Sequence, residues 1–563
     1  MSKIKVLNEH LKNMIAAGEV VERPAGVVKE LVENSIDADS HKIEVHLQNG
    51  GLDTIEVRDD GCGMDKKDAT AAFGRHATSK IEFDQDLWNI HTMGFRGEAL
   101  PSIASVSKLE MYTSDGIDQT KVVIEYGQIK EVKPVGCNQG TTIKVQGLFY
   151  KTPARLKHLK SANNELTTII DLLSKLALAH PDIAFKLFDN DKLKLQTNGS
   201  NNLKETIMSI YGLETAKKAI DFKCNDYDFE VDGCIISPVI TRSSKQYINI
   251  FINSRVIKSF LLTNSVIDGY KQYIMDNRYP IVIINIKADY QLIDVNVHPS
   301  KWEVRLSKER QLASLIKDNI EKTLAKAYHP SDLLLKDNLL NENSLPKKQN
   351  EKTQIVQQTL LDREDDREEE KIIDRFVYLC QYHGKYILAS DEDNLYIIDQ
   401  HAAQERCMYE DIQKQIENKE IKTQLLLVPL LIESTISTVN RIDEINEKLS
   451  CINLNFEQFS STTLLLREVP YFFENIDEID FLNHLIEEVL SDKSMSVLEI
   501  RKEKIASLAC HSSVRFNHYL SVEESKKLLA RLSNCKQPFN CPHGRPTMIS
   551  ISDKQLFKEF KRG

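Results

Sequence analysis

The clearest hydrophobic pattern near the start of the chain covers residues 24–37. Its apolar positions recur at helical spacing, and they are Val27, Val28, Leu31, Val32 and Ile36. Pro24 suits the first turn of the predicted helix, because its fixed φ is already helical. The polar positions at i, i+3, i+4 and i+7 share the opposite face, and they are Glu30, Glu33, Asn34 and Asp37. By itself this pattern is most typical of an ordinary amphipathic helix with a solvated polar face.

Alternating patterns after this helix predict strands. Apolar and polar residues alternate over residues 42–47, and the alternation resumes at Ile55 and Val57 after an Asn-Gly-Gly turn at residues 49–51. This arrangement predicts a hairpin with one face against a core. Residues 279–286 form an apolar run that is typical of a buried strand. Strand and helix patterns alternate in both halves of the chain, so we expect a mixed α and β fold.

One long stretch has no periodic pattern. Residues 329–371 are polar, and they end in an acidic block at residues 362–370. Such a segment cannot bury enough apolar surface to offset the entropy lost on ordering, so we predict a flexible linker. The part of the chain before the linker is larger than a usual single core, and we expect it to divide near the polar loop at residues 196–204.

Composition excludes several classes of protein. The chain has 563 residues, of which 41% are hydrophobic and 28% are charged, as expected for globular domains. We find no apolar run of about 18 residues and no apolar core in residues 1–10, so we predict neither a membrane-spanning helix nor a secretory signal. The ten cysteines are scattered singly, which favours reduced thiols in the cytoplasm. Because the net charge is −10, binding of nucleic acid needs a local basic surface or a metal ion.

Three short motifs change the interpretation of the first helix. Asp59 ends the second hairpin strand and is followed by Gly61 and Gly63, so a carboxylate can meet a ligand where glycines let the backbone approach it. A glycine-flanked loop at residues 92–98 opens another predicted helix, whose free N–H groups suit phosphate. A Gly-Thr pair begins a predicted strand at residues 140–145. The chain has no Gly-x-x-x-x-Gly-Lys-Ser/Thr sequence, so it is not a P-loop protein.

In this order the pieces resemble the GHKL ATPases, a group that includes gyrase, heat-shock chaperones, histidine kinases and MutL. Four flanking segments resemble the MutL family of mismatch-repair proteins almost residue for residue, and they are residues 15–24, 74–80, 94–99 and 148–155. The resemblance implies an α+β multidomain protein. Its implied parts are a GHKL (Bergerat) ATPase α/β sandwich at residues 1–200, a ribosomal-S5-like transducer domain at 201–328, a flexible linker at 329–371, and an α/β C-terminal dimerisation and endonuclease domain at 372–563.

The resemblance also assigns roles around ATP and Mg²⁺. Glu30 is implied to be the general base that activates water, and Asn34 the Mg²⁺ ligand. Asp59 is implied to accept a hydrogen bond from the adenine amino group. The other implied contacts are Gly61 and Gly63 in the adenine pocket, Thr78, Ser79, Arg96 and Gly97 in the phosphate lid, and Lys301, which reaches the γ-phosphate from the second domain. For Arg75 and His76, a nucleotide contact and a structural role both remain open.

A second candidate site lies in the C-terminal part. His401 and Glu405 are four residues apart, so on a helix they face the same way and can share a metal ion with the nearby Asp399. Such a pair also occurs often among core and surface residues, so it is weak evidence alone. Cys541 and His543 form a compact Cys-x-His pair with the spacing of metal ligands.

These C-terminal segments resemble the endonuclease-type members of the MutL family. Residues 399–410 match the signature DQHA-x-x-E-x-x-x-x-E, residues 541–546 match CPHGRP, and residues 560–562 match Phe-x-Arg. The resemblance implies a DNA nickase that depends on Mn²⁺ and/or Zn²⁺. The implied metal ligands are Asp399, His401, Glu405, Cys510, Cys541 and His543, of which Asp399, His401 and Glu405 are implied to be catalytic. The family usually has Arg or Lys at the position of His511, so the role of that residue stays open.

One segment resembles a partner-binding motif. The residues similar to the short motif that docks in the replication sliding clamp are Gln424, Leu427, Val428 and Pro429. A buried strand would explain the same aliphatic pattern. Gln357 begins a rival motif of the same loose form within the predicted linker.

Other partners are less specified. Basic residues cluster at residues 151–160 and 242–258, and each cluster either contacts phosphate or simply faces water. Since no sequence-reading motif occurs, binding of double-stranded DNA should be non-specific and sensitive to salt. The resemblance implies a homodimer and a MutS mismatch-recognition partner, and no membrane. We therefore expect an ATP-gated cytoplasmic protein with weak ATPase and DNA-nicking activities.

Two alternatives compete with this interpretation. One is a non-nucleolytic, ATP-switched matchmaker in mismatch repair, against which the intact signatures at residues 399–410 and 541–546 weigh. The other is a different GHKL machine. A topoisomerase subunit or a chaperone would lack both signatures, and a sensor kinase would need a phosphoacceptor helix ahead of its ATPase domain. We expect no such helix, because the ATPase signature begins almost at Met1.

Overall fold

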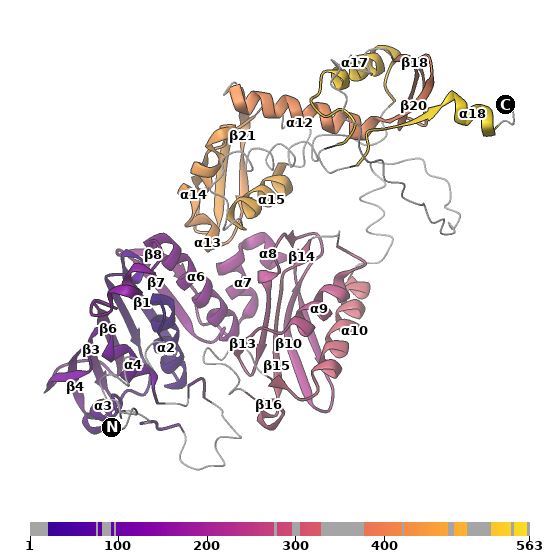
Figure 1. Cartoon of the computed structure of the whole chain (residues 1–563). Helices are drawn as coiled ribbons and strands as arrows, with labels where there is room; N and C mark the ends of the chain where they lie inside the picture. Colours follow the sequence, from indigo (N-terminus) through magenta and orange to yellow (C-terminus); the bar gives the residue numbers. More distant parts are fainter. Residues whose placement is uncertain are drawn as a thin grey trace, which may run out of the picture. The chain divides into compact units, whose positions relative to one another are not determined.

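The computed structural model (Figure 1) describes residues 21–74, 77–80, 92–94, 97–274, 278–294, 305–327, 376–418, 421–470, 478–491, 519–541 and 545–559. The chain divides into two compact units. The first comprises Met1–Pro330 together with Leu431–Glu444 and Glu457–Leu465, and the second comprises the rest. None of the helices in these residues is long and apolar enough to cross a membrane.

An eight-stranded sheet forms the first part of the N-terminal unit. Its order is β5-β4-β3-β6-β2-β1-β7-β8, and all neighbours are antiparallel except the parallel pair β1 and β7. The strands are β1 (Lys42–Gln48), β2 (Thr54–Asp59), β3 (Lys108–Ser114), β4 (Gln119–Glu125), β5 (Gln128–Pro134), β6 (Gly140–Gln146), β7 (Ala184–Asp189) and β8 (Lys192–Gln196). The predicted hairpin is confirmed as β1 and β2, with Val45 opposite Val57.

Helices pack against this sheet. Those in contact with its strands are α2 (Pro24–Asp37), α3 (Lys66–Ala71), α4 (Ala99–Ser105) and α6 (Ala162–Ala179), and the short helix α5 (Pro153–Lys157) follows β6 in the sequence. Helix α2 begins at Pro24, as predicted, and its residues Val28 and Leu31 join Val45 and Val57 in one hydrophobic core. Because the apolar stripe of α2 is used in this way, its polar stripe is left for other contacts.

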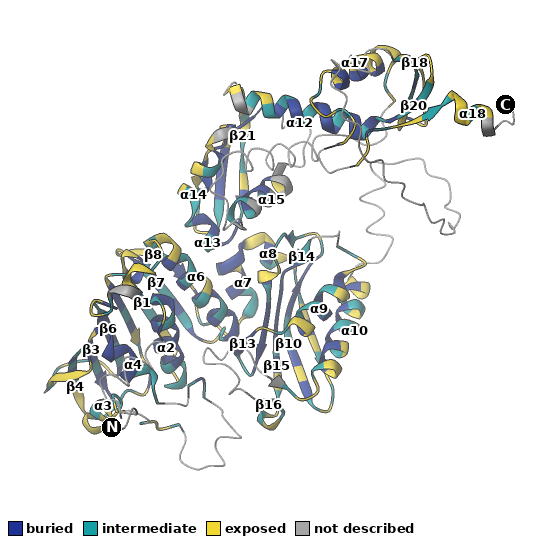
Figure 2. Cartoon of the chain, in the orientation of Figure 1, coloured by how far each residue is buried: buried dark blue, intermediate teal, exposed yellow. Residues whose placement is uncertain are grey.

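A second sheet of the same unit has the order β13-β12-β15-β10-β9. Its strands are β9 (Ala219–Asn225), β10 (Phe229–Ile236), β12 (Ile248–Ile252), β13 (Arg255–Ile257) and β15 (Val282–Ala288), and its helices are α7 (Leu203–Tyr211), α8 (Leu213–Lys217), α9 (Phe260–Tyr270) and α10 (Glu309–Ala327). Leu262 of α9 and Ile316 of α10 share a core with Ile284 of β15. Figure 2 shows the buried positions that run along β10 and β15.

The predicted buried strand at residues 279–286 is confirmed with one interruption. It forms β14 (Tyr279–Pro280) and then β15, which are separated at Ile281. Short strands complete this region in two pairs, β11 (Thr241–Arg242) with β14, and β16 (Ile293–Asp294) with β17 (Arg305–Leu306).

The C-terminal part contains two further sheets. The four-stranded sheet β18-β19-β20-β24 consists of β18 (Val377–Tyr382), β19 (Tyr386–Ser390), β20 (Asn394–Asp399) and β24 (Met548–Ser552), with α12 (Gln400–Asn418), α17 (Val522–Ser533) and α18 (Asp553–Glu559). The three-stranded sheet β21-β23-β22 consists of β21 (Thr423–Glu433), β22 (Phe456–Gln458) and β23 (Thr463–Pro470), with α13 (Ile436–Val439), α14 (Ile442–Leu449) and α15 (Glu478–Ser491). Cys407 of α12 and Leu528 of α17 share the core of the first of these sheets with Ile398.

Candidate functional sites

A cavity of about 630 Å³ opens beside the polar face of α2. The predicted nucleotide-site residues that line it are Glu30, Asn34, Asp59, Gly63, Thr78, Ser79 and Gly97. Gly61 is not part of the lining, but its N–H donates to Asp59 Oδ1 at 3.1 Å. Arg96 and Lys301 lie outside the described residues, as do Arg75 and His76. The structure therefore brings most of the predicted set into one cavity, and the predicted residues that line it come from four separate segments.

Asp59 is half-buried at the end of β2, and three donors hold its carboxylate. The Ser35 hydroxyl donates to Oδ2 at 2.8 Å, while the N–H groups of Gly61 and Thr141 each donate to Oδ1 at 3.1 Å. Burial raises the pKa of Asp59, although these hydrogen bonds favour the charged form. The sequence pattern did not single out Ser35. The clue to Ser35 that the sequence offered was a hydroxyl group directly after Asn34 in the same helix.

Glu30 has a buried cationic neighbour that the sequence pattern also left unmarked. Lys29 is 9% exposed, and its Nζ lies 3.2 Å from Glu30 Oε1 and 3.0 Å from Glu33 Oε1. Burial alone would lower the pKa of Lys29, but the Glu33 and Glu30 carboxylates outweigh it and raise that pKa. Lys29 therefore stays charged and fixes one oxygen of Glu30. The i, i+4 spacing of Lys29 and Glu33 was the available signal.

A cationic group also lies against the polar face of α2 at its C-terminal end. Lys80 Nζ donates to Asn34 Oδ1 at 3.0 Å and forms an ion pair with Asp37 Oδ2 at 2.6 Å. Asp37 in addition accepts hydrogen bonds from the N–H groups of Met93 (2.6 Å) and Gly94 (3.0 Å). Helix α2 thus anchors the loop that precedes α4.

The same loop is anchored from the second sheet. Arg255, at the start of β13, is 8% exposed and donates from Nη2 to the carbonyl oxygen of Thr92. Burial lowers the pKa of Arg255, and the Glu33 and Asp37 carboxylates oppose this effect. For the basic cluster at residues 242–258, neither contact with phosphate nor exposure to water describes Arg255, or Arg242, which is 6% exposed beside the Tyr247 ring. In the cluster at residues 151–160, by contrast, Lys151, Lys157, His158 and Lys160 are exposed.

Two glycines of the cavity occupy positions that only glycine fills easily. Gly63 and Gly97 have φ values of 69° and 61°, in the left-handed region. A Cβ atom at Gly63 would overlap the carbonyl oxygen of Ser114, and one at Gly97 would overlap that of Ala77. These glycines allow close approach between backbone segments, and so they shape the cavity wall.

The C-terminal candidate residues gather at the junction of β20 and α12. Asp399 is the last residue of β20, and its Oδ1 accepts hydrogen bonds from the N–H groups of His401 (2.9 Å) and Ala402 (3.1 Å), so it caps the helix. The predicted helical spacing is confirmed, because His401 Nε2 lies 3.2 Å from Glu405 Oε1. Glu405 is only 3% exposed.

A distant segment is held against the same helix. Arg406 Nε donates to the carbonyl oxygen of Asn540 at 2.5 Å, and the next residue, Cys541, is buried. Glu410, the last residue of the predicted signature, accepts hydrogen bonds from the N–H groups of Lys536 (2.7 Å) and Gln537 (3.2 Å). The Glu410 carboxylate therefore binds backbone N–H groups of this distant segment.

Only part of the predicted metal site lies within the described residues. Within its described residues, no group of three or more His, Cys, Asp or Glu side chains is arranged to hold a metal ion. Cys510, His511, His543 and residues 560–562 lie outside those residues.

The sliding-clamp motif lies on β21. Gln424 and Pro429 are half-buried, whereas Leu425, Leu427 and Val428 are exposed. The alternative of a buried strand is therefore wrong for these three aliphatic residues, although the segment is a strand. Gln357 lies outside the described residues.

Comparison with known proteins identifies the family. Three family models match: a histidine kinase-, DNA gyrase B- and HSP90-like ATPase at residues 22–147, the C-terminal domain of a DNA mismatch repair protein at 207–325, and the MutL C-terminal dimerisation domain at 379–520. The DNA mismatch repair protein MutL of Listeria welshimeri is 40% identical over 99% of this chain and 98% of its own length. The chain belongs to the MutL family. MutL of an Exiguobacterium species is 39% identical over 100% of both chains.

Membership of the MutL family defines the general activity. The chain is a DNA mismatch repair protein with a GHKL ATPase domain that binds ATP, and its C-terminal dimerisation domain supports a homodimer. The predicted fold class is confirmed for the ATPase domain, the mixed sheets and the separate C-terminal domain. Among solved structures, the crystal structure of the N-terminal domain of a DNA repair protein is 29% identical, with a TM-score of 0.48, and covers 57% of this chain and 99% of that chain.

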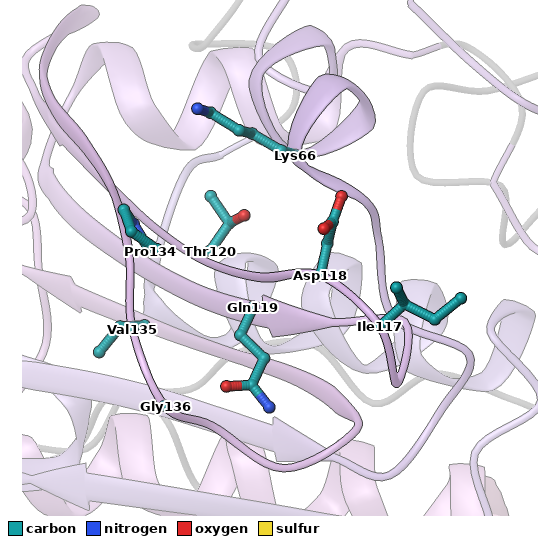
Figure 3. A pocket seen from close by; sticks show the side chains of 8 residues that line it. All are labelled: Lys66, Ile117, Asp118, Gln119, Thr120, Pro134, Val135 and Gly136. Carbon is teal, nitrogen blue, oxygen red and sulfur yellow. The ribbon is translucent and has the colours of Figure 1, made fainter.

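A second hollow in the MutL-family ATPase domain contains none of the predicted residues. This hollow has a volume of about 530 Å³ and lies at the start of β4 and the end of β5. Figure 3 shows its lining side chains, among them Lys66, Asp118, Gln119 and Val135. Its rim residue Ile117 is largely exposed. The cavity at α2 is therefore the candidate ATP site, since it collects most of the nucleotide-site residues that the structure describes.

Proposed function

We propose that the chain is an ATP-gated homodimer of the cytoplasm that couples mismatch recognition to metal-dependent nicking of double-stranded DNA. The proposed parts are an ATPase domain at residues 1–200, a transducer domain at 201–328, a linker at 329–371 and a dimerisation and endonuclease domain at 372–563. The observation that carries the nicking activity is the start of α12, where Asp399 caps the helix that aligns His401 with Glu405.

Glu30 is the proposed general base of ATP hydrolysis. Its carboxylate lines the cavity, and Lys29 holds Oε1 at 3.2 Å, so the side chain is oriented before water is activated. Asp59 is the proposed acceptor for the adenine amino group. A carboxylate accepts about four hydrogen bonds, and the donors already present on Asp59 leave room for one from adenine.

Asn34 is the proposed Mg²⁺ ligand. The Lys80 ammonium group lies 3.0 Å from Asn34 Oδ1 and 2.6 Å from Asp37 Oδ2, which supports a cation-binding position at this end of α2. Hard oxygen ligands beside phosphates are what Mg²⁺ prefers. The other proposed nucleotide contacts are Gly61, Gly63, Thr78, Ser79, Arg96, Gly97 and Lys301.

The proposed gate connects α2 with the second sheet. Asp37 holds the N–H groups of Met93 and Gly94, and Arg255 holds the carbonyl group of Thr92. ATP that reorders this loop would therefore act on both anchors, which gives the nucleotide a physical route to the transducer domain.

The residues at α12 fit a divalent transition metal. His401 offers an imidazole, Asp399 and Glu405 offer carboxylates, and Cys541 offers a thiol, all of which bind Zn²⁺ or related ions. The buried carboxylate of Glu405 lies 3.2 Å from His401 Nε2, and a metal ion would supply the positive charge that a buried carboxylate favours. A bound metal would neutralise phosphate charge and provide hydroxide. The further proposed ligands are Cys510 and His543.

We assign the partners by their chemistry and by family membership. The exposed aliphatic residues of β21 support docking of a sliding clamp, and the proposed contacts are Gln424, Leu427, Val428 and Pro429. A MutS mismatch-recognition protein is the proposed loading partner. The exposed basic residues at 151–160 are the proposed non-specific DNA contacts.

Nicking of supercoiled plasmid in Mn²⁺ tests the proposal. Asp399→Asn should abolish nicking but keep ATP hydrolysis, because Asn caps a helix as well as Asp does but removes a charged ligand. Glu392→Gln, an exposed carboxylate in the turn before β20, is the matched control and should nick normally. Normal nicking by Asp399→Asn would exclude the α12 site. If no version nicks even with clamp and ATP present, the matchmaker alternative replaces the nickase.

A further inference from the structure

Two cysteines outside the proposed sites lie side by side. The sulfur atoms of Cys407 and Cys535 are 3.8 Å apart, although 128 residues separate them in the sequence. Cys407 is on α12, is 2% exposed and belongs to the local core. Cys535 follows the end of α17 and is half-buried. One sulfur is therefore shielded and the other can be reached from solvent.

Contacts on both sides fix this pair in position. Leu528 and Leu532 of α17 share the hydrophobic core with Cys407. On the exposed side, Arg531 forms an ion pair with Asp411 at 2.5 Å. The residue after Cys535 donates its N–H to Glu410 at 2.7 Å. The approach of the two sulfur atoms thus follows from the packing of α17 on α12.

We propose that Cys407 and Cys535 are a redox-active pair, which a low-molecular-weight disulfide oxidises reversibly to an intramolecular disulfide. The bond requires the sulfur atoms to close from 3.8 Å to about 2.05 Å, a change within reach of side-chain rotation. It would join α12 to the segment that leads to Cys541. This inference does not depend on the nicking activity.

The exchange proceeds in two balanced steps. The Cys535 thiolate attacks one sulfur of the small disulfide, whose S–S bond breaks, so a mixed disulfide forms on Cys535 and one small thiolate leaves. Cys407 then loses its proton to solvent and attacks the Cys535 sulfur, and the second small thiolate leaves. Two protein thiols are oxidised while one small disulfide is reduced to two thiols.

The structure also sets the order of attack. Cys535 is the accessible sulfur, and it is within hydrogen-bonding distance of the buried Cys407 sulfur. This hydrogen bond lowers the pKa of Cys535. Cys407 is shielded from small reagents, so it acts second, as the resolving thiol.

Peptide mapping of the full-length chain tests the pair. The protein is incubated with oxidised glutathione, its remaining thiols are blocked with N-ethylmaleimide, and it is digested with trypsin without reduction. We expect tryptic peptides 407–414 and 532–536 to be joined, with a mass about 2 Da below the sum of the free peptides. Dithiothreitol should release both peptides.

Variants assign the linkage. Cys535→Ser should remove the joined peptides, whereas the matched control Cys380→Ser, at an exposed cysteine of β18, should keep them. Cys407→Ala should stop the reaction at a glutathione adduct on Cys535. The proposal is overturned if the unchanged protein gives both peptides blocked by N-ethylmaleimide, or gives only a glutathione adduct on Cys535. Because these two outcomes are measured on the unsubstituted protein, a variant that fails to fold does not affect them.

Discussion

The ATP cavity and the C-terminal site differ in how their side chains are held. Around α2, Glu30, Asn34 and Asp59 come from elements of one sheet-based core, and each already has hydrogen-bonding partners. Around α12, one helix supplies His401 and Glu405, while Cys541 comes from a distant segment that backbone contacts hold. Side chains of one continuous core therefore arrange the first site, whereas the second depends in addition on a segment held against α12 from 134 residues away in the sequence. We expect the first to tolerate loss of a functional group without loss of shape.

The largest expected effect is on the rate of ATP hydrolysis, and it distinguishes the catalytic role of Glu30 from its role in the shape of the ATP cavity. Glu30→Gln should lower the rate of ATP hydrolysis by roughly 100-fold or more, with little change in nucleotide affinity, because the amide fills the same space but cannot take a proton. Steady-state ATPase assays and nucleotide titration measure the two quantities. Glu22→Gln, at an exposed carboxylate just before α2, is the control. Undiminished turnover would remove Glu30 as the base.

The next effect concerns nucleotide affinity. Asp59→Asn should weaken ATP binding by about 10- to 100-fold, since a hydrogen bond to a charged group is worth about 1.5–3 kcal/mol. Asp60→Asn should not, because Asp60 accepts hydrogen bonds from the N–H groups of His41 and Lys42 through an oxygen that Asn retains. Equal losses in the two variants would contradict the adenine contact.

The pH dependence gives an independent check on Asp59. Burial raises the pKa of its carboxyl group. As the pH falls through this raised pKa, the carboxylate gains a proton and loses an acceptor, so ATP affinity should begin to fall at a higher pH than an ordinary aspartate would produce. The affinity of Asp59→Asn should lack this titration. Isothermal titration at a series of pH values measures it.

A smaller effect should appear where the cavity meets the second sheet. Arg255→Met removes the donor to the Thr92 carbonyl group, so the loop loses one anchor. We expect kcat to fall by about tenfold while ATP affinity changes by less than about threefold, as loss of one charge-assisted hydrogen bond predicts. Arg255→Lys keeps the charge but not the planar fork, so its kcat should be intermediate. Arg310→Met, exposed on α10, is the control. A change in affinity alone would assign Arg255 to nucleotide binding instead of the gate.

The same contrast explains what could be predicted from the sequence. Periodicity predicted α2, the β1–β2 hairpin and the alignment of His401 with Glu405, because these features depend on spacing within one element. It did not predict the burial of Arg255, which depends on packing between two sheets. Lys29 was missed for another reason. A lysine followed by glutamates one and four residues later in a helix is usually a surface residue, and only the burial of Lys29 gives it a role.

In the C-terminal site, even fewer of the contacts could be predicted from the sequence. The sequence predicted Asp399 as a ligand but not as a helix cap, since capping requires knowledge of where the helix begins. Glu410 belonged to the same signature, yet its oxygens bind the N–H groups of Lys536 and Gln537. Because the partners lie 126 and 127 residues apart in the sequence, no local pattern could have predicted this contact.

The smallest expected effect separates the two roles of Asp399. Asp399→Ala removes the cap and should destabilise the start of α12 by about 1 kcal/mol, whereas Asp399→Asn should cost much less. Hydrogen exchange at the His401 and Ala402 N–H groups, which donate to Asp399 Oδ1, measures this locally. Exchange should be about fivefold faster in the Ala variant and nearly unchanged in the Asn variant. If exchange is accelerated equally in the Ala and Asn variants, the side-chain oxygen is not the cap. The C-terminal site is then organised by its metal ligands instead. If only the Ala variant exchanges faster while both variants lose nicking, the cap and the ligand are separate properties of one carboxylate.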